Sequence, residues 1–128
     1  MDDRGVTPEE VRRLALALPE ATEAPHHDRT SFRVGGKIFA TMPPDGDSVN
    51  VMLGEEESRA ATDEAPGVVE LLWWGRRLSG VRIVLAGVDP ALVAELLEDG
   101  WQRRAPRAVA AGREADRKAA DAAREPPP

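Results

Sequence analysis

The 128-residue chain has no cysteine, and only five of its residues are phenylalanine or tryptophan. Without cysteine it cannot form a disulfide framework, a thiolate nucleophile or a cysteine-ligated zinc site. No apolar run approaches the roughly 20 residues of a membrane span, and the N-terminus lacks the basic and apolar regions of a secretory signal. We therefore expect a soluble, cytoplasmic protein with no membrane partner.

Enzyme signatures are also absent. The sequence has no Gly-x-Gly-x-x-Gly or Walker loop for nucleotide phosphates, and no Gly-x-Ser-x-Gly or His-Glu-x-x-His motif of hydrolases. The acidic clusters Glu9-Glu10 and Glu55-Glu56-Glu57 are typical of helix starts, where carboxylates interact favourably with the helix dipole. We therefore expect no catalytic activity and no cofactor.

His26, His27 and Asp28 are candidate metal ligands that are adjacent in sequence. Imidazole and carboxylate are suitable ligand types, but a closed metal site needs three or four converging donors. The chain has no other histidine. We therefore interpret these residues as part of a surface loop and expect no metal site.

Acidic residues outnumber basic ones, with 23 Asp and Glu against 17 Lys and Arg, which gives a formal net charge of −6. Residues 107–128 carry five basic and four acidic side chains, so residues 1–106 carry 12 and 19, a net charge of −7. An acidic protein is poorly suited to indiscriminate binding of polyanions. The charge of the globular part therefore limits the affinity expected for a nucleic acid.

The stretch from Ser31 to Met42 is the clearest β-hairpin signal, because two alternating apolar and polar segments flank Gly35 and Gly36. The glycines supply the positive φ values of a tight two-residue turn. In the first strand, Phe32 and Val34 should share one face. In the second strand, Lys37, Phe39 and Thr41 should alternate with Ile38, Ala40 and Met42.

Helices are expected at both ends of the sheet. Thr7 is a natural N-cap before Pro8, and the apolar spacing that follows predicts a helix over residues 8–18. Asp89 and Pro90 give the same signal for a last helix that ends near Arg104. Between these helices we expect a loop over 20–30, the hairpin, a strand over 49–53, a short helix over 55–62, a strand over 68–74, a turn over 75–80 and a strand over 81–88.

These elements predict an α+β fold, with an antiparallel sheet flanked by N- and C-terminal helices in the order α-β3-α-β2-α. The domain should cover residues 5–106. Residues 107–128 are rich in alanine and charge and hold almost no large apolar side chain. We expect a solvated, partly disordered extension that can form a marginal helix but cannot anchor itself to the core, with its final three prolines disordered.

Several short motifs make the chain similar to a known family. They are Leu18-Pro19-Glu20, Phe32 to Ala40, Trp74-Gly75, and the segment from Leu96 through Trp101 to Pro106-Arg107. In this order, and within residues 6–109, they resemble the MmcQ/YjbR family. The resemblance implies the same α-β3-α-β2-α fold and DNA binding through two winged hairpins, with a regulatory role as its expected context.

On this resemblance, the expected partner is double-stranded DNA, bound weakly by a monomer. The basic side chains that can meet its phosphates lie in two hairpins and at the end of the last helix. They are Arg33, Lys37, Arg76, Arg77, Arg82, Arg103, Arg104 and Arg107. The same residues can also be ordinary solvated positions, where Lys and Arg protect the edges of a sheet.

A second hypothesis is a non-enzymatic module that binds a small apolar ligand or a protein partner. Its binding face would hold Met52, Trp74 and Trp101, because the tryptophans all fall in the second half of the chain. Core packing is the competing role for these side chains. Salt separates the two hypotheses, because phosphate contacts weaken with added salt whereas apolar burial does not.

Overall fold

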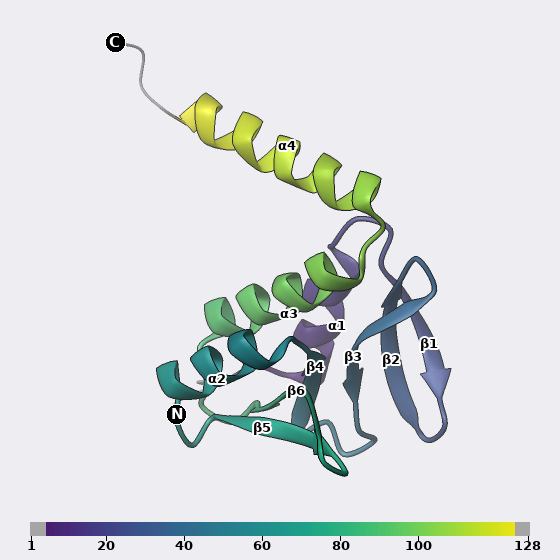
Figure 1. Ribbon diagram of the computed structural model, residues 1–128, viewed down its shortest axis with the longest axis vertical. Coiled ribbons are helices and arrows are strands. Elements are labelled where there is room, and N and C mark those ends of the chain that lie inside the picture. The colour runs from purple at the N-terminus through teal and green to yellow at the C-terminus, as the bar shows by residue number, and fades with distance from the viewer. Residues whose placement is uncertain (1–4, 125–128) are drawn as a thin grey trace.

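The computed structural model describes residues 5–124 and shows a twisted antiparallel sheet with helices packed on one face (Figure 1). The six strands lie in the order β1-β2-β3-β4-β6-β5. The elements are α1 (Pro8–Leu16), β1 (Thr22–His26), β2 (Arg29–Val34), β3 (Lys37–Met42), β4 (Ser48–Met52), α2 (Glu55–Glu64), β5 (Val69–Trp74), β6 (Arg77–Val84), α3 (Pro90–Arg104) and α4 (Arg107–Arg124).

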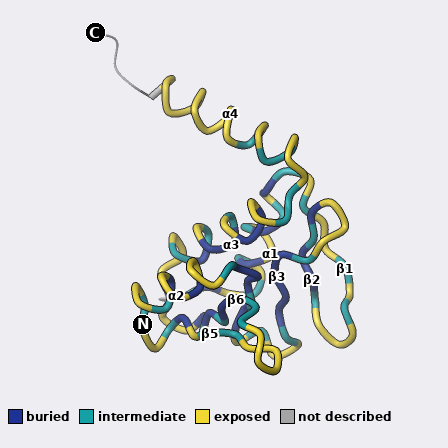
Figure 2. Tube along the Cα trace, viewed as in Figure 1, coloured by how far each residue is buried: buried dark blue, intermediate teal, exposed yellow. Residues whose placement is uncertain are grey.

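The hydrophobic core lies between the sheet and the helices α1, α2 and α3, where the tube in Figure 2 is dark blue. Trp101, Phe32 and Phe39 are the largest of its fully buried side chains. Val11 and Ala15 of α1 belong to the same cluster. Because each helix turns its apolar side to the sheet, burial of this shared cluster holds the two layers together.

The predicted α+β class with an antiparallel sheet is confirmed, but the sheet has one strand more than predicted. Residues 20–30, predicted as a loop, contain β1, which pairs with β2 from Thr22 opposite Arg33 to His26 opposite Arg29. None of the five side chains of β1 is buried, so the strand has no apolar alternation to reveal it. Its Pro25 is tolerated because β1 is an edge strand.

The glycine turn between β2 and β3 is confirmed. Gly35 and Gly36 have φ values of 58° and 78°, the pair of positive values that a type I′ turn needs. A side chain at Gly35 would also collide with the ring of Pro106, 2.9 Å from the Cβ position. The hairpin tip therefore packs against the start of α4.

The predicted alternation along β3 is wrong. The register shifts between Phe32 and Arg33, so that Phe32 lies opposite Ala40 and Arg33 lies opposite Ile38. Ile38 and Ala40 therefore point to opposite faces, and Phe39 is the extra residue of a β-bulge. Phe39 is fully buried, although the alternation placed it with polar neighbours.

The bounds of α1 and β6 also differ from the sequence prediction, and β6 ends at Val84 instead of residue 88. α1 ends at Leu16 instead of residue 18. β6 begins at Arg77 instead of residue 81, so the turn predicted over residues 75–80 consists of Gly75 and Arg76 alone. The bounds of α2, β5 and α3 agree with the prediction to within two residues.

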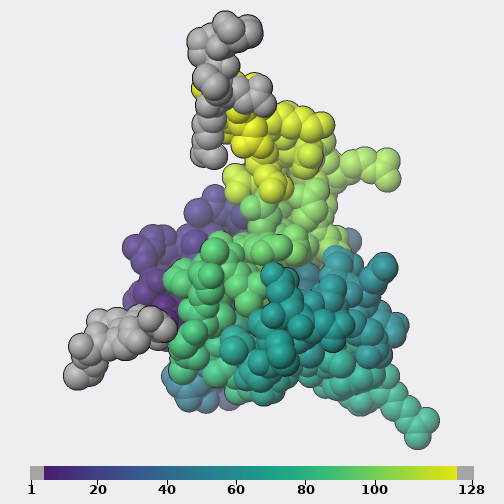
Figure 3. Space-filling view, turned by 90° about the vertical axis from the view of Figure 1, so that its left-hand side faces the viewer, coloured from purple at the N-terminus to yellow at the C-terminus, as the bar shows by residue number. Residues whose placement is uncertain are grey.

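The stretch predicted as a solvated extension contains α4, which points away from the body of the molecule (Figure 3). Val109 packs against the core cluster, and Arg113 and Arg117 pair with Glu98 of α3 at 3.2 and 3.1 Å. The last three prolines lie outside the described residues. Among the helices of residues 5–124, none combines the length and the apolar character needed to cross a membrane.

Candidate functional site

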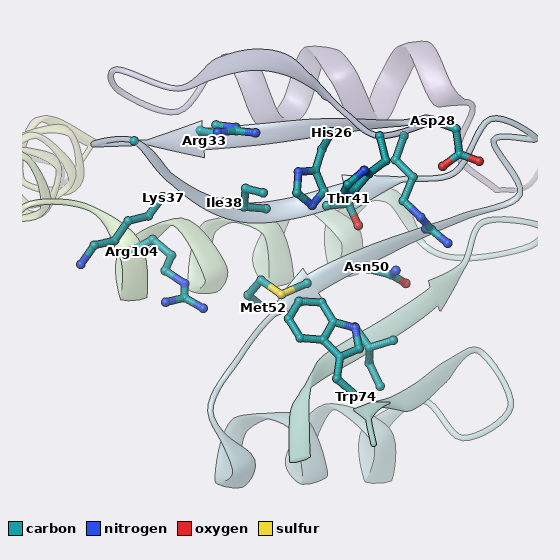
Figure 4. A pocket seen from close by; sticks show the side chains of 14 residues that line it. His26, Asp28, Arg33, Lys37, Ile38, Thr41, Asn50, Met52, Trp74 and Arg104 are labelled. Atoms are coloured by element: carbon teal, nitrogen blue, oxygen red, sulfur yellow. The ribbon is translucent and has the colours of Figure 1, made fainter. Parts of the chain in front are cut away.

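The sheet face opposite the helices is hollowed into a groove of about 940 Å³ (Figure 4). β1 and β2 form one side and β5 forms the other, so that His26 and Trp74 lie across the groove from each other. Arg104, at the C-terminal end of α3, is the one lining residue that comes from a described helix. The floor comes from β3 and β4 and consists of Ile38, Thr41, Asn50 and Met52.

Two irregularities curl the sheet around this groove. The strand register shifts between Phe32 and Arg33 on one side, and between Leu72 and Trp73 on the other. A bulge bends its strand and increases the local twist, and the twist accumulates over the six strands. The outer hairpins β1–β2 and β5–β6 therefore rise on either side of the floor.

One end of the groove is basic, because Lys37 and Arg104 lie together there (Figure 4). Arg33 lines the same groove from β2, and its Nε donates a hydrogen bond to the Oγ of Ser31 at 3.0 Å. Ser31 is fully buried, and its Oγ donates to the carbonyl of Ala24 at 2.7 Å. These two hydrogen bonds hold the guanidinium of Arg33 against the β1–β2 ladder.

A smaller adjoining hollow shares Trp74 and Arg104 with the groove and adds Arg77 and Arg103. Burial, followed by the positive charges of Arg103 and Arg77, lowers the pKa of Arg104. The Nε of Arg104 is buried and has no hydrogen-bond partner among residues 5–124. Three guanidinium groups therefore lie close together here.

The groove and the adjoining hollow are basic although the chain as a whole is acidic. Their linings contain one carboxylate, Asp28, at the end of the groove away from Lys37 (Figure 4). Helix α2, in contrast, carries five carboxylates and one arginine. The basic side chains in the two linings are Arg29, Arg33, Lys37, Arg77, Arg103 and Arg104.

Three of the predicted basic residues lie elsewhere. Arg76 is exposed in the turn between β5 and β6, and Arg107 is exposed at the start of α4. Arg82 lies on β6 and pairs with Glu70 of β5 at 3.3 Å, which partly neutralises its charge. The other five predicted basic residues gather in the groove and the adjoining hollow.

The apolar face predicted from Met52, Trp74 and Trp101 is only partly assembled. Met52 and Trp74 line the groove, and the side chain of Trp74 is 60% exposed. Trp101 does not join them, because it is fully buried in the core on the other side of the sheet. Its indole N–H donates to the carbonyl of Pro19 at 2.9 Å, which satisfies the polar end of the buried ring.

Sequence reasoning did not find Arg29, Asn50 and the two histidines as groove residues. Arg29, His26 and His27 reach the groove only because residues 22–34 form the β1–β2 hairpin, with His27 at a φ of 59° in its turn. Asn50 occupies an ordinary polar position in an alternating strand, so its sequence context carries no signal. Within residues 5–124 no three His, Cys, Asp or Glu side chains are placed to hold a metal ion.

Chemically, the groove combines two kinds of binding group. Its guanidinium and ammonium groups can donate charge-assisted hydrogen bonds to phosphate or carboxylate oxygens. Its floor is partly apolar, and Trp74 presents an exposed indole for a flat group. A ligand that suits both kinds of group carries negative charge and a flat, partly apolar ring.

Comparisons with known proteins concern the family and the fold. The family model described as YjbR matches residues 16–103. The crystal structure of Deinococcus radiodurans protein DR2400, with the family-model domain DUF419, matches with a TM-score of 0.65 and 20% sequence identity, covering 76% of this chain and 77% of that chain. At this identity the likeness concerns the fold alone. None of the curated proteins matches the chain.

Proposed function

Because the chain belongs to the YjbR family, we propose that it is a DNA-binding protein and that the basic groove is its DNA-contacting surface. The family resemblance suggests the ligand, and the geometry suggests the place. One observation carries the proposal: five predicted basic residues from four elements, β2, β3, β6 and the end of α3, gather in the groove and the adjoining hollow. They are Arg33, Lys37, Arg77, Arg103 and Arg104.

The charge balance of the chain sets the kind of binding to expect. With a net charge of −6, the molecule repels DNA at long range, so attraction depends on close approach of the groove. Each phosphate neutralised by Lys or Arg contributes about −0.9 to the slope of log affinity against log salt concentration. We therefore expect weak DNA binding whose affinity falls steeply as salt is added. The proposed function is binding and not catalysis.

The proposal is tested by fluorescence anisotropy with a labelled DNA oligonucleotide between about 20 and 200 mM salt. The double variant Lys37→Ala/Arg77→Ala removes one exposed cation from the groove and one from the adjoining hollow. We expect a loss of affinity of about tenfold or more at low salt, with the salt slope reduced by about 2.

Arg59→Ala is the matched control, because Arg59 is an exposed arginine on α2, away from the groove lining. It should bind DNA like the parent chain. Absence of DNA binding by the parent chain at the lowest salt would refute the proposal. If the control lost as much DNA affinity as the double variant, the contact surface would not be the groove.

A second function, binding of a small apolar ligand or a protein partner, is favoured by the apolar side chains in the groove. Ile38, Met52 and Leu72 lie in the lining with the exposed Trp74. Binding of this kind keeps or gains strength as salt is added. Trp74 and its neighbour Trp73 are the exposed tryptophans that would report it by fluorescence, because Trp101 is buried in the core and contributes a constant background.

A further inference from the structure

Two side chains that line the groove carry buried polar atoms that nothing in the described chain satisfies. The Oδ1 of Asn50 is buried on the floor without a hydrogen-bond partner among residues 5–124, and so is the Nε of Arg104 at the basic end. Buried polar atoms in folded proteins are nearly always paired. An acceptor and a donor that both lack a partner in one groove point to a ligand with its own polar edge.

Trp74 supplies a second, independent observation. It is 60% exposed and lines both the groove and the adjoining hollow, whereas Trp73 lines neither. Arg77 is its partner in the β5–β6 ladder, and Arg104 lines the same two hollows. An aromatic ring among cations is the arrangement with which proteins stack nucleic-acid bases while holding the adjacent phosphates.

The shape of the surface decides which form of DNA fits. In a duplex, the base edges lie inside the grooves, so a protein reads them with an element that protrudes, such as a helix or a β-ribbon. Asn50 and Met52 are instead at the bottom of a hollow, between the hairpins β1–β2 and β5–β6. A duplex resting on the rim cannot bring a base to them, whereas an unpaired base can turn out of the strand and enter.

The size of the groove agrees with this choice. A volume of about 940 Å³ is at the upper end of the range for small-ligand sites, about 300–1,000 Å³. It accommodates a base with its sugar and phosphate, with the strand continuing out at the open ends. The basic end with Lys37 and Arg104 lies beside the path that the backbone would take (Figure 4).

We infer that the groove binds single-stranded DNA, with one unpaired base stacked on Trp74 and its polar edge toward Asn50, and with the backbone phosphates held by Lys37, Arg77 and Arg104. This inference rests on the proposed DNA-binding function and specifies the form of the ligand. It differs from the sequence prediction, which expected double-stranded DNA as the partner and which stays a prediction.

The test compares three probes by anisotropy and tryptophan fluorescence at about 50 mM salt: oligothymidine of about 12 nucleotides, a blunt duplex of the same length, and the mononucleotide dTMP. We expect the single strand to bind at least about tenfold more tightly than the duplex and to quench Trp74 emission. Trp74→Ala should lose about tenfold or more in affinity for the single strand, and Trp74→Phe should retain most of it.

Trp73→Ala is the matched control, because Trp73 is the neighbouring exposed tryptophan, 48% exposed, and lines neither hollow. It should bind the single strand like the parent chain. The inference would be overturned if duplex and single strand bound equally and Trp74→Ala bound like the parent chain. If Lys37→Ala/Arg77→Ala still weakened binding, the proposed DNA-binding function would stand. Failure of both DNA forms to bind would overturn both. If dTMP bound as tightly as the oligonucleotide, the groove would be a mononucleotide site and the inference of a single-strand site would be overturned.

Discussion

Trp74 and Trp101 show how strongly the surroundings of a residue decide its role. The indole of Trp101 is fully buried and ties α3 to the segment after α1 through its hydrogen bond to Pro19. The indole of Trp74 is mostly exposed at the side of the basic groove. One side chain therefore stabilises the fold, whereas the other is available to a ligand at little cost to the core.

Asp99 is the residue whose titration should affect stability. Partial burial, followed by the nearby carboxylates Glu95, Glu57 and Glu98, raises its pKa above the ordinary value of 3.8, and Arg117 opposes the shift. The folded state thus binds this proton more tightly than the unfolded state does. Ionised Asp99 lowers the free energy of unfolding. This destabilisation is absent below the unfolded-state pKa, and it grows as the pH rises through the folded-state pKa.

Asp99→Asn should therefore stabilise the protein at about pH 7 and have no effect near pH 3. Asp99 is classed as exposed, so solvent screening limits the gain to about 0.5 kcal/mol, or roughly 2 °C in melting temperature. Thermal unfolding followed by circular dichroism at both pH values measures it. Asp116→Asn, at an exposed site on α4, is the control for the same change in net charge. A gain that persists at low pH would rule out this electrostatic origin.

At the scale of elements, the approach of α3 to the sheet depends on a glycine inside the helix. Gly100 is buried, and a Cβ there would lie 2.6 Å from Cγ1 of Val51 and 3.2 Å from the carbonyl oxygen of Phe39. Glycine in a helix interior costs about 1 kcal/mol relative to alanine. The cost is offset here because the helix backbone can lie directly on β3 and β4 and close the core.

Gly100→Ala should consequently destabilise the protein although alanine is the better helix former. The collision should cost about 1–3 kcal/mol, which exceeds the gain in helix propensity and gives a net loss of about 1 kcal/mol or more. Gly112→Ala in α4 is the control, since within residues 5–124 no atom apart from the neighbouring backbone of the same helix lies within 4 Å of a Cβ at that position. It should leave the free energy of unfolding unchanged or raise it. Urea unfolding of both variants gives the comparison, and an equally stable Gly100→Ala variant would disprove the close packing.

The edge strand β1 is the element that joins the fold to the groove. It has no buried side chain, and it is attached by the ladder to β2, by the hydrogen bond from Ser31 to Ala24 and by the ion pair between Glu23 and Arg12 of α1. Ser31 also accepts the hydrogen bond from Arg33. The same side chain thus fixes the edge of the sheet and orients a cation of the groove.

Over the whole molecule, the helices carry exposed carboxylates that lie outside the basic groove. α1 and α2 carry exposed carboxylates such as Glu9, Glu56 and Glu64, while the open face of the sheet carries the basic groove. At low ionic strength the Debye length is about 30 Å, so these carboxylates act across the molecule, whereas at 0.15 M salt it is about 8 Å. They therefore reduce DNA affinity mainly when the salt concentration is low.

A triple variant, Glu9→Gln/Glu56→Gln/Glu64→Gln, tests this effect. It reduces the net negative charge from −6 to −3. At about 10 mM salt we expect DNA binding several-fold tighter than that of the parent chain, and above about 0.15 M the two should be equal. Anisotropy titrations across this salt range measure the difference. A gain of the same size at all salt concentrations would indicate that these residues touch the DNA directly.

The sequence by itself determined the features that depend on a few neighbouring residues. Thr7 before Pro8 and Asp89 before Pro90 mark the two helix starts, and Gly35-Gly36 marks the hairpin turn, because caps and tight turns are local choices of φ and ψ. Together with the family motifs, they were sufficient for the α+β class.

Only the tertiary structure decided which side chains meet. The strand β1 forms because its backbone pairs with that of β2. Residues 22–26 have no apolar alternation that predicts a strand. The bulges in the β2–β3 and β5–β6 pairs curl the sheet and collect Arg33, Lys37 and Arg104 around Trp74. Strand register and sheet curvature are set by contacts between residues far apart in the chain, so local propensity cannot specify them.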